Sequence, residues 1–242
     1  KSPLSLYENI RKKPVPKSGF AGEKKPNILD SFFRFIRGNF YLPDARKGWN
    51  KSAYSVAKNI ITTHDIDTII TSSPPHSTQL VGLKLKQELA VKWICDLRDP
   101  WTELFYNKDL YQTSIAKRID KKYEKNCLES ANELIVVSKT ISNQFIKSYP
   151  ITASKMNIIP NGYDPADFKN VKEIIIDHKY ISYIGSLGEI YPIDKMIKAF
   201  KDLCLIEPKW KLRFVGNIPE STKSIIKNNK LESSVEIGSY KP

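Results

Sequence analysis

Two polar clusters carry the side chains of this chain that are best suited to chemistry. The sequence SSPPH at 72–76 follows a short β-branched run, and DLRDPW at 96–101 follows a second apolar run. Leucines at helical spacing lie between them, which predicts a strand-helix-strand unit. Because the carboxyl ends of parallel strands line the crevice where ligands bind, we expect His76 and Asp99 to share one rim of a site.

An imidazole and a carboxylate on such a rim suit hydrogen bonding to a substrate hydroxyl and acceptance of its proton. Both residues also have structural alternatives. For His76 the alternative is a surface residue that caps a helix. For Asp99 it is an Asp-Pro turn or an ion pair with Arg98.

Later segments end strands on the same edge. Asn161 and Gly162 follow an apolar run at 155–159. They suit backbone contact with a phosphate or the hinge of a closing cleft, and a plain turn is the alternative. Ser138 follows the run at 133–137 and suits either contact with a substrate or capping of the next helix.

The elements that must position these side chains alternate regularly. Between residues 67 and 159 the pattern is βαβαβαβ, and a second series of strands and helices begins at residue 180, with glycine turns after its first two strands. This alternation is typical of doubly wound parallel sheets. We predict an α/β fold with two incomplete Rossmann-like domains and a cleft between them.

The domain boundaries follow from composition along the chain. Residues 1–165 form the predicted first domain, the polar, turn-rich stretch 166–178 the linker, and residues 179–242 the start of the second domain. Residues 1–27 are rich in proline and basic residues without sustained periodicity, so we expect a mobile or extended segment there.

Composition narrows the class of protein. The chain has 242 residues, 40% of them hydrophobic, which indicates a globular protein with a sizeable core. Its three cysteines are far apart in apolar surroundings, which favours neither disulfides nor zinc and indicates a reducing cytoplasm. No apolar run approaches the roughly 20 residues that span a bilayer. The three histidines lack ligand spacing, so we expect no metal site.

Charge indicates an anionic partner. The formal net charge is +13, which fits nucleic acid, an acidic membrane surface, phosphate-bearing substrates or merely a solvated lysine-rich surface. An amphipathic stretch that contains Phe32, Phe33, Arg34 and Arg37 predicts either docking on an anionic membrane or core phenylalanines with solvated arginines. Nucleic acid is not expected as a partner, because no recognised motif accompanies the charge.

Four motifs, taken in order, resemble a known family. They are SSPPHST, DLRDPW, IIPNGYD at 158–164, and YIGSLGEIYPIDKMIKAF at 183–200, which is followed by LRFVGN. With these motifs the chain resembles the retaining glycosyltransferase family 4, whose members have the GT-B architecture of two facing Rossmann-like domains. The resemblance runs from about residue 43 to the end of the chain.

The resemblance implies transfer of a sugar from a nucleotide-sugar donor to a saccharide or lipid-linked acceptor, with retention at the anomeric carbon and without a metal or other cofactor. Similar enzymes assemble capsule, O-antigen or exopolysaccharide. This implies a bacterial protein of the cytoplasm that is soluble or peripheral on the inner membrane surface. A non-catalytic α/β module that binds nucleotides or anionic polymers is the alternative.

The strand-end positions and the resemblance together assign three groups of site residues. They are His76 and Asp99 for catalysis; Ser73, Arg98, Trp101 and Ser138 for the acceptor side; and Asn161, Gly162, Gly185, Ser186 and Gly216 for the donor.

The sequence departs from the family's pattern in two respects. The amino-terminal strand with its glycine-rich loop and the later part of the carboxy-terminal domain are missing, so we expect a piece of a longer protein. In the donor loop the family's arginine and lysine correspond to Ser186 and Tyr191, and Pro192 replaces a glycine. We expect the helix that begins near Pro192 to stabilise the leaving diphosphate instead, together with either Lys195 or a basic side chain from the missing region.

Overall fold

The computed structural model of the protein describes residues 28–169, 179–188 and 191–238. The predicted mobile segment 1–27 and most of the predicted linker lie outside these residues. The described chain divides after Tyr163 into two compact units, each with its own sheet and core. The predicted domain boundaries themselves stay predictions.

The first unit is built on a parallel four-stranded sheet whose strands lie in sequence order. The strands are β1 (Thr68–Ser73), β2 (Lys92–Leu97), β3 (Glu133–Val136) and β4 (Met156–Ile158); the helices are α2 (Ile28–Phe40), α3 (Asn50–Thr63), α4 (Ser77–Glu88), α5 (Ser114–Ser130) and α6 (Lys139–Ser148), with short 3₁₀ helices η1 (Lys47–Trp49), η2 (Phe105–Leu110) and η3 (Pro150–Lys155). The elements fall close to their predicted positions, and the α/β prediction is confirmed.

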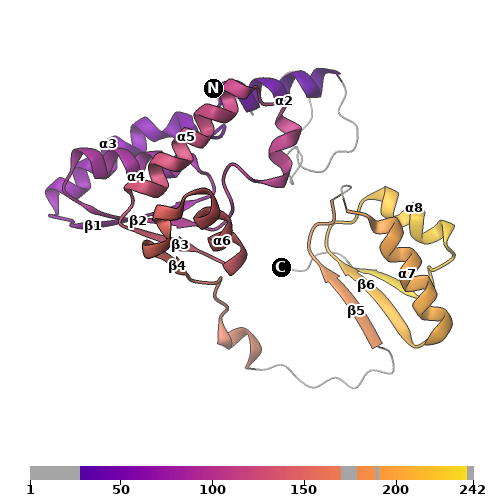
Figure 1. The fold of residues 1–242 in the computed structure, drawn as a ribbon. Coiled ribbons are helices and arrows are strands. Elements are labelled where there is room, and N and C mark those ends of the chain that lie inside the picture. The colour runs from indigo at the N-terminus through magenta and orange to yellow at the C-terminus, as the bar shows by residue number, and fades with distance from the viewer. Residues whose placement is uncertain (1–27, 170–178, 189–190, 239–242) are drawn as a thin grey trace. The chain divides into compact units, whose positions relative to one another are not determined.

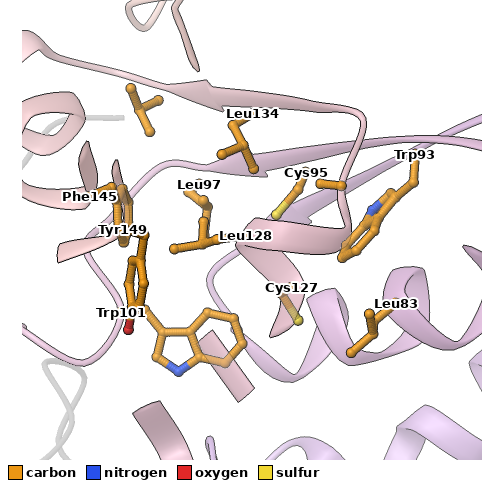
Figure 2. Close-up of a cluster of buried hydrophobic side chains, with 12 residues drawn as sticks. Leu83, Trp93, Cys95, Leu97, Trp101, Cys127, Leu128, Leu134, Phe145 and Tyr149 are labelled. Carbon is orange, nitrogen blue, oxygen red and sulfur yellow. The ribbon is translucent and has the colours of Figure 1, made fainter. Parts of the chain in front are cut away.

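The crossover helices α4, α5 and α6 pack on one face of this sheet (Figure 1). A parallel crossover is right-handed, so strands that follow one another in order across a sheet place each connecting helix on the same side. The inward strand residues meet the helices in one apolar cluster (Figure 2), which contains Trp93, Cys95, Leu97, Leu134 and Val136 from the strands, Leu83, Cys127, Leu128 and Phe145 from the helices, and Trp101 and Tyr149 from the connections. The described strands and helices thus form one side of a doubly wound sheet.

Helix α2 buries a polar face. Its buried positions are Asp30, Arg34 and Gly38, which recur every four residues and therefore lie on one side of the helix. This side packs against η2 and α5. Gly38 fits there because a Cβ on it would lie 2.3 Å from the backbone oxygen of Leu110.

The opposite side of α2 exposes its large apolar side chains. Ile28 is 91% exposed, Phe32 57% and Phe40 75%. The alternative of core phenylalanines is therefore wrong for Phe32. The expectation that Arg34 faces a membrane is also wrong, because this side chain is only 2% exposed. No helix in the described part of the chain combines the length and apolarity needed to cross a bilayer.

The second unit repeats the same arrangement with three parallel strands in sequence order. It contains β5 (Lys179–Ile184), β6 (Trp210–Val215) and β7 (Val235–Gly238), helices α7 (Ile193–Ile206) and α8 (Glu220–Asn228), and the 3₁₀ helix η4 (Pro165–Phe168). Helices α7 and α8 share a buried cluster with Leu212 and Phe214 of β6, so both cover the same face of the sheet (Figure 1).

Candidate functional site

The four strands of the first unit end on one line. Ser73, Leu97, Val136 and Ile158 pair in register from β1 to β4, and each is the last residue of its strand. The segments that follow the strands therefore begin at one edge of the sheet, which is where parallel sheets bind ligands. The site residues predicted in this unit follow these strand ends or, like Ser73, lie on them.

His76 is buried against Trp101 at this edge. Its side chain is 6% exposed, and its ring stacks on the indole with centroids 4.9 Å apart and planes at 9°. Neither ring nitrogen has a hydrogen-bond partner of good geometry among the described residues. Burial lowers the pKa of His76, while Asp44, the Pro100 carbonyl and Asp99 act in the opposite direction. The alternative of a surface histidine is wrong, and the ring is neutral at neutral pH.

Asp99 is exposed and close enough to His76 to act on its charge. The two predicted catalytic residues lie in the segments that follow the neighbouring strands β1 and β2. Arg98 pairs with Asp96 at 3.3 Å rather than with Asp99, so the alternative of an Arg98–Asp99 pair is wrong. The exposed carboxylate of Asp99 suits proton acceptance from a bound hydroxyl. Its catalytic role stays a prediction.

Arg98 links the segment after β2 to the segment after β4. Its guanidinium donates to Asp96 Oδ1 at 3.3 Å, to the Ile159 carbonyl at 3.5 Å and to Asn161 Oδ1. Asp96 in turn accepts a 2.7 Å hydrogen bond from Ser72. These contacts tie together three strand ends, so Arg98 and Asn161 shape the edge. Whether they also contact acceptor or donor stays a prediction.

Ser73 belongs to a buried network centred on Gln79, which the sequence did not single out. Gln79 Nε2 donates to Ser73 Oγ at 2.9 Å and to the Asp96 carbonyl at 2.8 Å, and its Oε1 accepts from Thr71 Oγ1. Ser73 is 1% exposed and Gln79 is fully buried. The network joins the ends of β1 and β2 beneath the rim. The Ser73 hydroxyl accepts from Gln79 and donates to the Asp96 carbonyl, so its hydrogen bonds lie inside the protein.

The other two residues predicted in this unit sit in simple local structure. Ser138 is the N-cap of α6 and accepts a 3.3 Å hydrogen bond from the Ile141 amide, so the capping alternative is confirmed. Gly162 is exposed, and a Cβ there would meet nothing within 4 Å. The backbone at Gly162 thus accommodates a side chain. A substrate contact at either residue stays a prediction.

Two buried acids of α5 hold the segment after β2, and sequence reasoning missed both. Asp120 accepts a 2.9 Å hydrogen bond from Trp101 Nε1. Glu124 accepts from the Thr102 amide at 2.9 Å, from Thr102 Oγ1 at 2.8 Å and from Tyr149 Oη at 2.7 Å. Asp120 is 4% and Glu124 3% exposed. The sequence offered one sign of this role: Asp120 and Glu124 are spaced i, i+4 and so lie on the same face of the predicted helix as its apolar residues.

Asp44 was also missed, although it stabilises the helix that carries His76. Its carboxylate accepts from the Ser77 amide at 2.7 Å and from Ser77 Oγ at 3.0 Å. It thereby satisfies a free N–H group in the first turn of α4, as a cap residue does. The α4 N-terminus is consequently occupied by a carboxylate of the chain itself.

In the second unit the predicted donor residues form a tight pair of turns. Gly185 and Gly216 have φ of +141° and +133°, which side chains rarely adopt. A Cβ on Gly216 would lie 2.2 Å from the Gly185 carbonyl oxygen, so the turns after β5 and β6 touch through their backbones. Ser186 is exposed, and its carbonyl accepts a 3.1 Å hydrogen bond from Tyr183.

Helix α7 begins at Ile193, so Pro192 is its N-cap rather than its first residue. Tyr191 and Lys195 are exposed beside this helix start, and Asp194 lies in the first turn. An acidic residue there weakens the attraction of the helix terminus for an anion, whereas Lys195 strengthens it. The predicted diphosphate contact of this helix stays a prediction.

Comparison with known proteins agrees with this architecture. The fold is similar to that of the lipopolysaccharide outer core galactosyltransferase WaaB in its apo form, with a TM-score of 0.53 at 14% identity and with 79% of this chain and 49% of that chain covered. It is also similar to that of Alr3699/HepE of Anabaena, solved in complex with UDP and glucose, with a TM-score of 0.50 at 17% identity and with 80% and 53% covered. These likenesses confirm the GT-B type of fold. No curated protein matches in sequence.

The fold and the strand-edge site define an α/β protein of the GT-B type. The profile of Glycosyltransferase Family 4 matches residues 18–167, more than half of the chain. The chain belongs to Glycosyltransferase Family 4, which confirms the predicted family. It spans about half the length of the two solved structures that it resembles.

Proposed function

We propose that the protein transfers a sugar from a nucleotide-sugar donor to a saccharide or lipid-linked acceptor. The observation that carries this proposal is the position of His76 and Asp99 after neighbouring strands at the carboxyl edge of the first sheet, in a chain of Glycosyltransferase Family 4. A buried neutral imidazole without a partner of its own gains a hydrogen bond when a hydroxyl binds beside it. An exposed carboxylate nearby accepts the proton that the acceptor hydroxyl loses.

We assign acceptor binding to the first unit and donor binding to the second. Ser73, Arg98, Trp101 and Ser138 remain our acceptor-side assignments, directly or through the shape of the edge. On the donor side, the paired glycine turns keep the backbone of Gly185 and Gly216 free of side chains, and Ser186 is exposed beside them. Exposed Lys195 offers a cation for the diphosphate that leaves.

The finer features rest on the motif resemblance described above. We propose transfer with retention, without a metal, in the assembly of a bacterial surface polysaccharide. The three cysteines are free thiols, and those of Cys95 and Cys127 are buried, which supports a reducing cytoplasmic setting.

We also propose that the first unit docks on an anionic membrane surface through α2. Phe32 and Phe40 are exposed together with Ile28, and each large apolar side chain that enters a membrane contributes about 1.5–3 kcal/mol. Arg34 supplies no surface charge, but α2 packs against α5, whose exposed first turns carry Lys117 and Lys121. Each such cation near anionic lipid contributes about 1 kcal/mol.

Turnover of the full-length enzyme tests the catalytic assignment. We expect His76→Ala and Asp99→Asn each to lower kcat at least about tenfold, which corresponds to roughly 1.4 kcal/mol of transition-state stabilisation. His64→Ala, which changes an exposed histidine of the same unit, is the matched control and should retain wild-type turnover. Wild-type rates in both site variants would remove the two residues from the active site.

A non-catalytic module that binds nucleotides is the second candidate, because Ser186 and Tyr191 stand where the family pattern has cations. NMR titration of the chain with UDP, GDP and their sugars separates the two. Chemical-shift changes around Gly185–Gly188 together with turnover by the full-length protein favour the enzyme. The same shifts without any turnover favour the module.

A further inference from the structure

We infer that Asp120 is a positioning residue for His76, which it holds in place through the indole of Trp101. The inference rests on the proposed function only in giving His76 a catalytic role; the physical link from Asp120 to His76 stands on contacts within the first unit. Three side chains from three different elements form this link, and each of them is almost completely buried.

The first contact fixes the plane of the imidazole. Neither ring nitrogen of His76 makes a hydrogen bond of good geometry with a described residue, although the Pro100 carbonyl acts on the ring, so rotation of the ring about its χ2 angle is limited mainly by packing. The indole of Trp101 lies 4.9 Å away with its plane only 9° from that of the imidazole. A ring stacked in this way keeps its nitrogens pointing within the common plane, so the position of Trp101 decides where they point.

The second contact fixes the indole. Trp101 Nε1 donates a 2.9 Å hydrogen bond to Asp120 Oδ1, and Trp101 is 1% and Asp120 4% exposed. A carboxylate is a costly partner for a buried indole, because removing it from water is unfavourable. An amide or hydroxyl would satisfy the same N–H group at lower cost. The carboxylate adds a stronger, charge-assisted hydrogen bond on a helix, which is a rigid support.

Burial shifts the pKa values of Asp120 and His76 in opposite directions, because it disfavours the charged form of each. Burial raises the pKa of Asp120 to about 6, and Glu124 and Asp44 act in the same direction. Hydrogen bonds from Trp101 and Gln112 act against this rise. Burial lowers the pKa of His76, with Asp44 and Asp99 opposing. At neutral pH an ionised Asp120 therefore holds the indole while the imidazole is uncharged.

Glu124 provides a matched comparison. It lies one helical turn from Asp120 on the same face of α5, is equally buried, and holds the neighbouring residue Thr102. Among the described residues it makes no hydrogen bond with Trp101 Nε1 or with His76. A purely structural role for the acids of α5 predicts similar effects of changing either one. A positioning role predicts that only Asp120 affects His76.

NMR of the 242-residue chain tests the link without any need for activity. The probes are the Trp101 Nε1–H signal and the His76 ring-nitrogen signals, each assigned by substitution of its residue. We expect the wild-type Trp101 signal to shift with a midpoint near pH 6. Asp120→Asn, which retains an acceptor, should remove this titration and leave the His76 signals in place. Asp120→Ala should shift the Trp101 signal and change or broaden those of His76. Glu124→Gln should lower only the midpoint of the Trp101 titration, because Glu124 raises the pKa of Asp120, and should leave the His76 signals in place.

Unchanged His76 signals in folded Asp120→Ala would overturn the inference. If Asp120→Ala does not fold, Asp120→Leu makes the same test, because it fills the space of the side chain without offering an acceptor. In the full-length enzyme we expect kcat to fall about tenfold in the variant without an acceptor and to be largely restored in Asp120→Asn. Altered His76 signals with wild-type kcat would support the link and contradict the catalytic role of His76, so the two failures are distinguishable.

Discussion

Folding raises the pKa of the Asp120 carboxyl group, and this makes the stability of the first unit depend on pH. Its carboxyl group lies against Trp101 with little access to water, and burial raises its pKa from 3.8 to about 6. The folded chain therefore binds this proton more tightly than the unfolded chain does. The resulting contribution to stability is complete below about pH 4 and is lost as the pH rises through about 6.

Replacing Asp120 with asparagine should therefore stabilise the first unit in a pH-dependent way. Asparagine retains the acceptor for Trp101 and cannot ionise. We expect the free energy of unfolding of Asp120→Asn, relative to wild type, to increase between pH 4 and pH 7 by on the order of 3 kcal/mol, which is the equivalent of the pKa shift. Urea unfolding at several pH values measures it, with Asp67→Asn at an exposed position as control. A pH-independent difference would contradict the prediction.

His76 and Asp99 could be found from the sequence because each belongs to a polar cluster that directly follows a strand. The register then brings those clusters together whatever the detailed packing. Gln79 and Asp120 could not be assigned in this way. Their roles depend on which side of α4 and α5 meets a particular loop, and a helix pattern gives the buried face but not the group buried against it.

At the scale of elements, the placement of His76 depends on the start of α4. His76 is the N-cap residue but makes no capping hydrogen bond with its side chain. Asp44, more than 30 residues earlier in the chain, supplies the missing acceptor for Ser77. Asn50 adds a 2.8 Å hydrogen bond to the Ser77 carbonyl. Asp44 before α3 and Asn50 at the start of α3 thus hold the turn that carries His76.

Asp44→Ala should loosen this turn. We expect a loss of about 1–2 kcal/mol in the free energy of unfolding, the usual effect of removing a helix cap, and faster amide exchange in the first turn of α4. Asp44→Asn keeps one acceptor oxygen and should lose less. Asp67→Ala is the exposed control in the same unit. Equal stability of Asp44→Ala and wild type would show that Asp44 does not support the helix.

The sequence predicts that α2 is a helix but not which of its sides is buried. Its apolar periodicity predicts a helix correctly, and amphipathic helices usually turn the apolar side inward. Here Asp30, Arg34 and Gly38 face inward, because Gly38 allows close approach to the backbone of Leu110. In the sequence, only the single residue Gly38 indicates this close packing of two backbones, so the inward side of α2 could not be predicted.

At the scale of the whole molecule, the two units share one topology and carry different surfaces. Both sheets have strands in sequence order and helices on one face. The first unit adds α2, with an apolar exposed side that none of the described residues covers. Exposed apolar side chains on α2 and exposed cations on α5 match the chemistry of an anionic bilayer, which offers a hydrophobic interior below a negatively charged surface.

Binding of the chain to vesicles tests this match. We expect sedimentation with vesicles of anionic phosphatidylglycerol and weak sedimentation with neutral phosphatidylcholine, and we expect added salt to weaken the binding because it screens the cations of α5. Phe32→Ser should weaken partitioning about tenfold or more, since the lost burial amounts to at least about 1.5 kcal/mol. Val56→Ser removes a side chain that is equally exposed at 60%, but on α3 of the same unit, and should bind as the wild type does. Equal binding to both kinds of vesicle, or equal loss in the two variants, would exclude α2 as the docking surface, because only contact through its apolar side makes Phe32 differ from Val56.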